Sequence, residues 1–152
     1  MADAVCEVWF YHLERTGLEQ ALPELLEKTL QRGWKAIVRA SATERLEHLD
    51  GWLWSYREDS FLPHAPAAEP GAERQPVLLT VGEDNPNAAN ALFLVDGAEP
   101  GDLSAYQRCV VLFDGADETQ LQRARGQWTA LKARGLPASY WKQQARGWEK
   151  QA

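Results

Sequence analysis

The feature that most constrains the fold is an alternation of short apolar runs with helix-length amphipathic segments. Two runs, ALFLVDG at 91–97 and CVVLFDG at 109–115, are almost wholly apolar up to an Asp-Gly pair. Such runs are typical of strands buried on both faces of a sheet. Similar runs at 5–13, 34–40 and 76–82 predict three more strands. We therefore expect a mainly parallel five-stranded sheet.

Two helices are predicted between these strands. Leucines recur at helical spacing over 18–30, and the helix start is open between Thr16 as a cap and Pro23 in the first turn. A second helix over 42–54 is expected to be capped by Ser41. Because strands and helices alternate, helices should cover both faces of the sheet.

A third and longer helix is predicted over 117–135. Asp114 or Asp117 should cap its start, and Gly135 should end it. The whole chain, 1–152, is expected to form a single three-layer, Rossmann-like α/β domain.

Composition predicts a globular protein of a reducing compartment. The chain is 45% hydrophobic and 25% charged, and it holds no run near the roughly 18 apolar residues of a membrane span. The first residues do not resemble a secretory signal. Cys6 and Cys109 lie far apart in apolar surroundings, which favours buried thiols. We expect a cytoplasmic protein.

The charge is distributed unevenly along the chain. Residues 119–152 carry seven basic residues and one acid, a net charge of 7 - 1 = +6. Residues 1–118 therefore carry -6 - 6 = -12. The basic end either faces an anionic partner or folds back on the acidic body, and composition leaves both readings open.

The sequence offers no recognisable catalytic centre. Asp96 and Asp114 end strands where a nucleotide enzyme would hold metal or ribose, but the chain has neither G-x-x-x-x-G-K-[ST] nor G-x-G-x-x-G. These aspartates are interpreted as turn formers and caps. His12, His48 and His64 lie in no catalytic motif, and no metal-ligand cluster is present. We expect a binding protein without cofactor or metal.

The third helix combines an aromatic residue with cations. At about 100° per residue, one arc should pack on the sheet; it holds Leu121, Ala124, Trp128 and Leu131. Arg125 and Lys132 lie beside this arc, and Arg123 and Arg134 lie on the far side. Trp128 is thus predicted at the border of core and solvent. This pattern fits a peptide with an apolar side chain and a carboxylate, or a core tryptophan beside solvated cations.

A second aromatic cluster marks the end of the 42–54 helix and the loop after it. The stretch DGWLWSYREDSFLPH, at 50–64, includes Trp52 and Trp54. Residues two apart on a helix face different ways, so at least one of these tryptophans should be near the surface. Exposed aromatic residues of this kind mark protein interfaces.

These segments together resemble the chi subunit family of DNA polymerase III. The similarity covers VWFYHL (8–13), KTLQRGWKAIVRA (28–40), LDGWLWSYREDSFLPH (49–64), QPVLLT (75–80), ALFLVDGAE (91–99), VVLFDGADETQLQRARGQWTALKARG (110–135) and YWKQQARGWEK (140–150). The resemblance implies a non-enzymatic accessory subunit of the clamp-loader assembly, with a nucleotide-binding-like fold that binds no nucleotide. It also implies two partners, the psi subunit and the acidic, Phe-ending C-terminal tail of single-stranded DNA-binding protein.

The resemblance assigns residues to each partner. The tail pocket would consist of Leu121, Gln122, Arg125, Trp128 and Lys132. The surface facing psi would consist of Trp54, Phe61, Pro63 and His64. Where some family members have a basic residue directly after the pocket aromatic, this chain has Thr129, and Lys132 could supply that charge. The alternative function is direct binding of single-stranded nucleic acid by the basic C-terminal segment.

Overall fold

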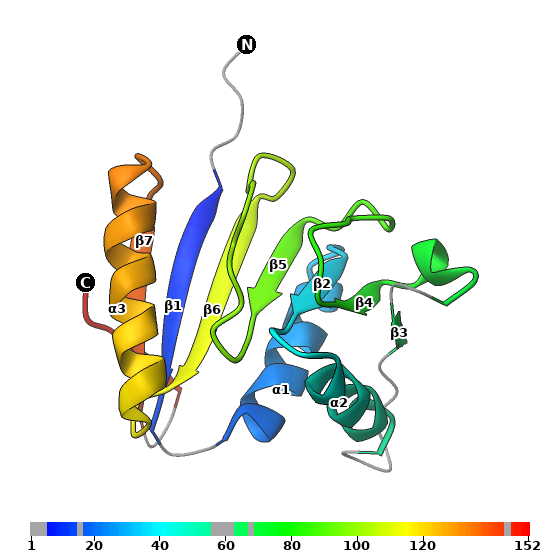
Figure 1. Cartoon of the computed structure of the whole chain (residues 1–152), viewed down its shortest axis with the longest axis horizontal. Coiled ribbons are helices and arrows are strands. Elements are labelled where there is room, and N and C mark those ends of the chain that lie inside the picture. Colours follow the sequence, from blue (N-terminus) through cyan, green and yellow to red (C-terminus); the bar gives the residue numbers. More distant parts are fainter. Residues whose placement is uncertain (1–5, 15–16, 56–62, 67–68, 145–146) are drawn as a thin grey trace.

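One mixed sheet organises the computed structural model, which describes residues 6–14, 17–55, 63–66, 69–144 and 147–152. Eight strands form in this part of the chain, in the order β3-β4-β2-β5-β6-β1-β7-β8 (Figure 1). Their bounds are β1 Glu7–Leu13, β2 Ala36–Arg39, β3 His64–Pro66, β4 Val77–Thr80, β5 Ala91–Leu94, β6 Arg108–Asp114, β7 Ala138–Gln143 and β8 Trp148–Lys150. Neighbouring strands run parallel except β7 and β8, which pair antiparallel.

The predicted number of strands was wrong, although all five predicted strands are present. β3 lies inside a stretch predicted to be a loop, and β7 and β8 lie in the C-terminal segment, where no strand was predicted. These three strands occupy the two ends of the sheet. β3 is only three residues long and every residue of β7 is half-buried, so neither strand has the long apolar run that indicates the central strands.

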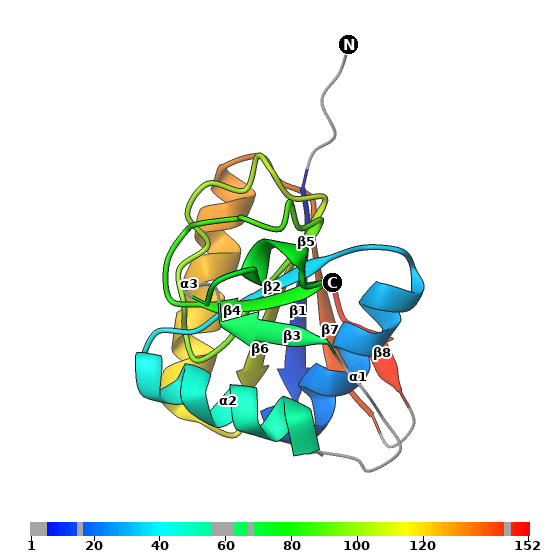
Figure 2. The ribbon, with the colours of Figure 1, turned by 90° about the vertical axis from the view of Figure 1, so that its right-hand side faces the viewer.

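Helices cover both faces of the sheet and produce the predicted three layers (Figure 2). Their bounds are α1 Leu18–Gln31, α2 Thr43–Ser55 and α3 Glu118–Ala133, with a short 3-10 helix, η1, at Ala72–Arg74. Side chains alternate along the strands: Phe10 and Ile37 face the core under α3, whereas Tyr11 and Val38 face the core under α1 and α2. The sheet thus separates two apolar cores.

Helix α1 includes a proline, and a side chain of α2 makes the hydrogen bond that this proline cannot make. The helix begins at Leu18 with Gly17 as N-cap, between the two predicted starts, and includes Pro23. Proline has no N–H to donate to the carbonyl four residues earlier, which belongs to Glu19. The indole N–H of Trp52 donates to that carbonyl instead, at 2.6 Å. This bond also joins α1 to α2.

The predicted Ser41 cap of α2 is wrong, whereas both predicted ends of α3 are confirmed. The hydroxyl of Ser41 donates to the carbonyl of Asp96 at 3.0 Å, away from the helix. At α3, the carboxylate of Asp117 accepts the N–H groups of Thr119 and Gln120. Gly135, with φ of +80°, ends the helix in the left-handed conformation that favours glycine.

Two glycines of this region give a matched test of helix propensity. A Cβ at Gly126, inside α3, meets nothing within 4 Å, so Gly126→Ala should raise the free energy of unfolding by about 0.5–1 kcal/mol. A Cβ at Gly135 also meets nothing, but its positive φ should make Gly135→Ala cost about 1–2 kcal/mol. Urea unfolding of both variants measures this, and changes of the same sign would contradict it.

Candidate peptide-binding surface on helix α3

Trp128 lies at the border between the core and solvent, as the helical spacing predicted. It is half-buried and packs against the cluster under α3. Its ring meets the buried ring of Phe10 edge-on, with centroids 5.4 Å apart. The ring of Tyr140, on β7, meets it at a similar angle, with centroids 6.0 Å apart. The buried ring of Phe10 therefore supports an aromatic surface that Trp128 and Tyr140 form.

Two cations border this aromatic surface. The ammonium of Lys132 lies 5.0 Å from the centroid of the Trp128 ring, within cation–π range. Arg125 is exposed, and its charge acts to lower the pKa of the Tyr140 hydroxyl, although burial raises that pKa overall. In the described part of the chain no carboxylate lies within 4 Å of either cation. Both are thus available to an external anion.

The remaining cations of α3 lie on its other side. Arg134 donates to the carbonyl of Gly101 at 3.0 Å, and the side chain of Arg123 lies against Gly97. The predicted division of the four cations into two pairs is confirmed.

The other predicted pocket residues lie on α3 in different environments. Leu121 is half-buried and packs on the same core cluster. Gln122 is exposed, and its amide donates to the carboxylate of Glu118 at 3.1 Å. The hydroxyl of Thr129 donates to the carbonyl of Arg125, so this position contributes no charge. Leu121 thus adds apolar area to α3, and Gln122 presents a polar side chain to solvent.

Tyr140 is a member of this surface that the sequence analysis missed. Its hydroxyl lies 2.5 Å from Nδ1 of His12, whose Nε2 lies 3.3 Å from the carboxylate of Glu14. Lys142 reaches the same carboxylate at 3.3 Å. Neutral His12 can accept the Tyr140 proton at Nδ1, which fixes the orientation of the phenol. Tyr140 could have been found only if β7 had been predicted as a strand that pairs with β1.

The His12–Tyr140 contact predicts a pH dependence. Burial lowers the pKa of His12 below its ordinary value of 6.5, against the opposing effect of Glu14. As the pH falls, His12 is therefore protonated in the unfolded chain before it is protonated in the folded protein. The stability that neutral His12 contributes above pH 6.5 should be lost as the pH falls from 6.5 through the folded-state pKa. Between about pH 8 and pH 5, urea unfolding should show a larger loss for the wild-type protein than for His12→Gln. Equal losses would contradict this.

The second predicted surface lies at the opposite end of the sheet, on α2 and β3 (Figure 1). Trp54 is 50% exposed, which confirms that one of the two neighbouring tryptophans is near the surface. The side chain of His64 is fully buried, with Nε2 3.0 Å from the carbonyl of Asp50, and its ring lies 4.2 Å from that of Trp54. Pro63 is half-buried, and Phe61 lies outside the described residues. His64 thus supports Trp54 from beneath.

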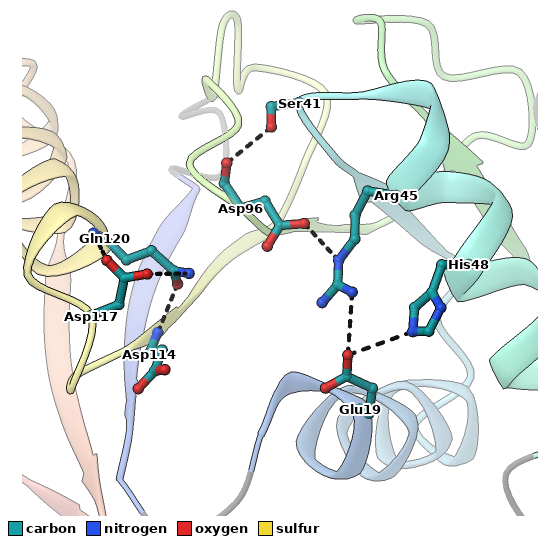
Figure 3. A network of polar contacts seen from close by, with 8 residues as sticks. All are labelled: Glu19, Ser41, Arg45, His48, Asp96, Asp114, Asp117 and Gln120. Atoms are coloured by element: carbon teal, nitrogen blue, oxygen red, sulfur yellow. Dashed lines mark hydrogen bonds and ion pairs between the residues drawn. The ribbon is translucent and has the colours of Figure 1, made fainter.

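The strand-ending aspartates have structural partners (Figure 3). Asp96 and Gly97 both have positive φ, as a type I′ turn requires, and the Asp96 carboxylate pairs with Arg45 at 2.7 Å. The Asp114 carboxylate accepts the N–H of Ala116 at 2.9 Å, and its own N–H donates to the side chain of Gln120. Both therefore act as turn formers, as predicted.

The thiols are free and buried, as predicted. Burial raises the pKa of Cys6 to about 11 and also raises that of Cys109, so neither is a ready nucleophile. Among the described residues, no three His, Cys, Asp or Glu side chains gather as a metal site would need. No helix in this part of the chain has the length and apolarity to cross a membrane.

Comparison of the fold defines its class. The chain superposes on the C-terminal domain of the DEAD-box protein Dbp5 over 91% of each chain, with a TM-score of 0.53 and 14% identity. At that identity the likeness shows the fold alone. The molecule is thus an α/β protein with helices on both faces of one sheet, and it carries a cationic, aromatic surface on α3.

Sequence comparison gives the family. The model described as "DNA polymerase III chi subunit, HolC" matches residues 6–139, and the chain belongs to this family. It is 30% identical to the DNA polymerase III subunit chi of Pseudomonas aeruginosa over 119 residues, which are 78% of this chain and 81% of that protein. It is also 24% identical to the probable subunit chi of Rickettsia prowazekii over 103 residues, 68% of this chain but only 62% of that protein. Membership implies an accessory role in DNA replication.

Proposed function

We propose that the protein is a non-catalytic subunit of the clamp-loader assembly of DNA polymerase III that binds the acidic C-terminal tail of single-stranded DNA-binding protein. It would act in the cytoplasm as one domain, without cofactor. The observation that carries the proposal is the half-buried Trp128 beside Arg125 and Lys132, two cations without a carboxylate partner in the described chain.

The chemistry of a Phe-ending acidic tail matches this surface. The phenyl ring would pack on Trp128 and Tyr140, which already meet edge-on, and on Leu121. The terminal carboxylate would pair with Arg125, which can form two parallel hydrogen bonds. Lys132 would attract the preceding acidic residues as a point charge. Because these cations are exposed, the affinity should weaken as salt is raised.

The psi subunit is the second proposed partner, at the surface of Trp54 and Pro63. An exposed tryptophan supported from beneath by a buried ring is the kind of anchor that dominates protein interfaces. His64 would act through Trp54 rather than by direct contact, and Phe61 is proposed from the resemblance alone. Because the two surfaces lie at opposite ends of the sheet, one molecule could hold both partners at once.

Direct binding of nucleic acid by the C-terminal segment is not favoured. Its cations are divided between two sides of α3, and Lys142 is neutralised by Glu14 at 3.3 Å. A single basic track is what such binding would need.

Co-elution in gel filtration tests the proposal. The protein should co-elute with intact single-stranded DNA-binding protein and elute separately from a version without its last residues. Co-elution that survives this truncation would contradict the tail as ligand.

A further inference from the structure

A stack of cations and indole rings lies on the sheet face that α1 covers. The guanidinium of Arg32, in the turn after α1, lies 4.2 Å from the ring centroid of Trp34. Arg108, on β6, lies 5.1 Å from the Trp34 centroid and 3.9 Å from that of Trp9. Trp141, on β7, stacks on Trp9 with centroids 5.6 Å apart. This ladder is separate from the surface on α3, because it lies on the other face of the sheet.

The cations of the ladder are not neutralised within the described chain. No carboxylate there lies within 4 Å of Lys28, Arg32 or Arg108. Burial lowers the pKa of Arg108, and the like charge of Arg32 lowers it further. The acid acting on Arg108 is Glu7, whose carboxylate accepts the indole N–H of Trp9 at 3.2 Å. Such a group of like charges is stabilised by an anion.

A small cavity opens beside the ladder. Its volume is about 170 Å³, and its lining includes Lys28, Thr29, Arg32, Trp34 and Arg108. Sites that enclose a whole small molecule span roughly 300–1,000 Å³. This cavity therefore suits one unit of a longer ligand, with an anionic group at the cations and a planar group at the rings.

We propose that this ladder binds single-stranded nucleic acid. One base would stack on the Trp34 face that Arg32 now covers, which is the reachable face because the Arg32 side chain is exposed. The displaced guanidinium would pair with the adjacent phosphate, together with Lys28. Arg108, held between Trp34 and Trp9, would hold the Trp34 ring in place and add positive charge. A base held in a duplex cannot stack in this way.

The charge of the protein sets the expected strength. The formal net charge of -6 opposes approach of a polyanion, so binding should be weak. For a single strand, each phosphate that the ladder neutralises should add about -0.7 to the slope of log affinity against log salt.

Fluorescence anisotropy of a labelled oligothymidylate tests the proposal on the full chain at low salt. Arg32→Glu should lower the affinity about tenfold and make the salt slope shallower by about 0.7. The matched control is Arg74→Glu, an exposed arginine of η1 whose reversal changes net charge equally and should change affinity less than about twofold. Arg125→Ala separates this site from the α3 surface and should leave oligonucleotide binding unchanged.

Weaker binding of a duplex of the same length, with loss confined to Arg32→Glu, would support the proposal. Absence of saturable binding at low salt would overturn it. Equal binding of duplex and single strand, or equal losses in the Arg32 and Arg74 variants, would also overturn it. If binding is lost in Arg125→Ala instead, the nucleic acid occupies the α3 surface and the ladder is not its site.

Discussion

Replacement of Phe10 by alanine is expected to lower the free energy of unfolding by about 3–5 kcal/mol. Phe10 is fully buried in the central strand β1, between the sheet and α3, and its ring supports Trp128 edge-on. The variant loses the burial of a large apolar side chain and leaves a cavity that the parallel strands on each side cannot close easily.

Val81→Ala is the control for this effect, because Val81 is 49% exposed and should change stability by less than about 0.5 kcal/mol. Urea unfolding followed by far-ultraviolet circular dichroism measures both variants. A cost for Phe10→Ala below about 1 kcal/mol would contradict the placement of Phe10 at the base of the α3 core.

Replacement of Trp128 by alanine should weaken binding of the tail peptide about 30-fold or more, which corresponds to about 2 kcal/mol. The indole ring is the centre of the surface: it meets Tyr140 edge-on and holds Lys132 within cation–π range. Its removal takes away the apolar contact for the phenylalanine and leaves Lys132 without the ring over which it lies.

Trp54→Ala is the matched control, since Trp54 is an exposed tryptophan at the other end of the sheet. We expect it to bind the tail peptide as the wild-type protein does and to lose binding of psi. Circular dichroism should show both variants folded. A similar loss of peptide binding in both would contradict two separate surfaces.

The central strands could be predicted from the sequence, but β3, β7 and β8, which lie at the two ends of the sheet, could not. The runs that became β5 and β6 are buried on both faces, so almost every residue in them is apolar. In β7 every residue is half-buried, and β3 is only three residues long, which leaves no periodic signal in either. The position of β7 depends on its pairing with β1, and that of β3 on its pairing with β4. Both pairings join segments that are separated in the sequence.

The candidate site could be predicted only as far as one helix determines it. Helical spacing was enough to place Trp128 at the border and to separate Arg125 from Arg123, because both follow from the geometry of one helix. Tyr140 was missed because it reaches the site through β7. Nor could the sequence indicate that Arg108 would lie between Trp9 and Trp34, with Trp141 stacked on Trp9, since these four residues come from four separate segments.

Calorimetric titration with an acidic peptide ending in phenylalanine tests the central claim most directly. We predict saturable binding to the wild-type protein that weakens from low to physiological salt. Arg125→Ala should lose at least about tenfold in affinity, about 1.4 kcal/mol, whereas Arg123→Ala, on the far side of α3, should change it less than about twofold. No binding to the wild-type protein, or equal affinities for all three proteins, would contradict the account.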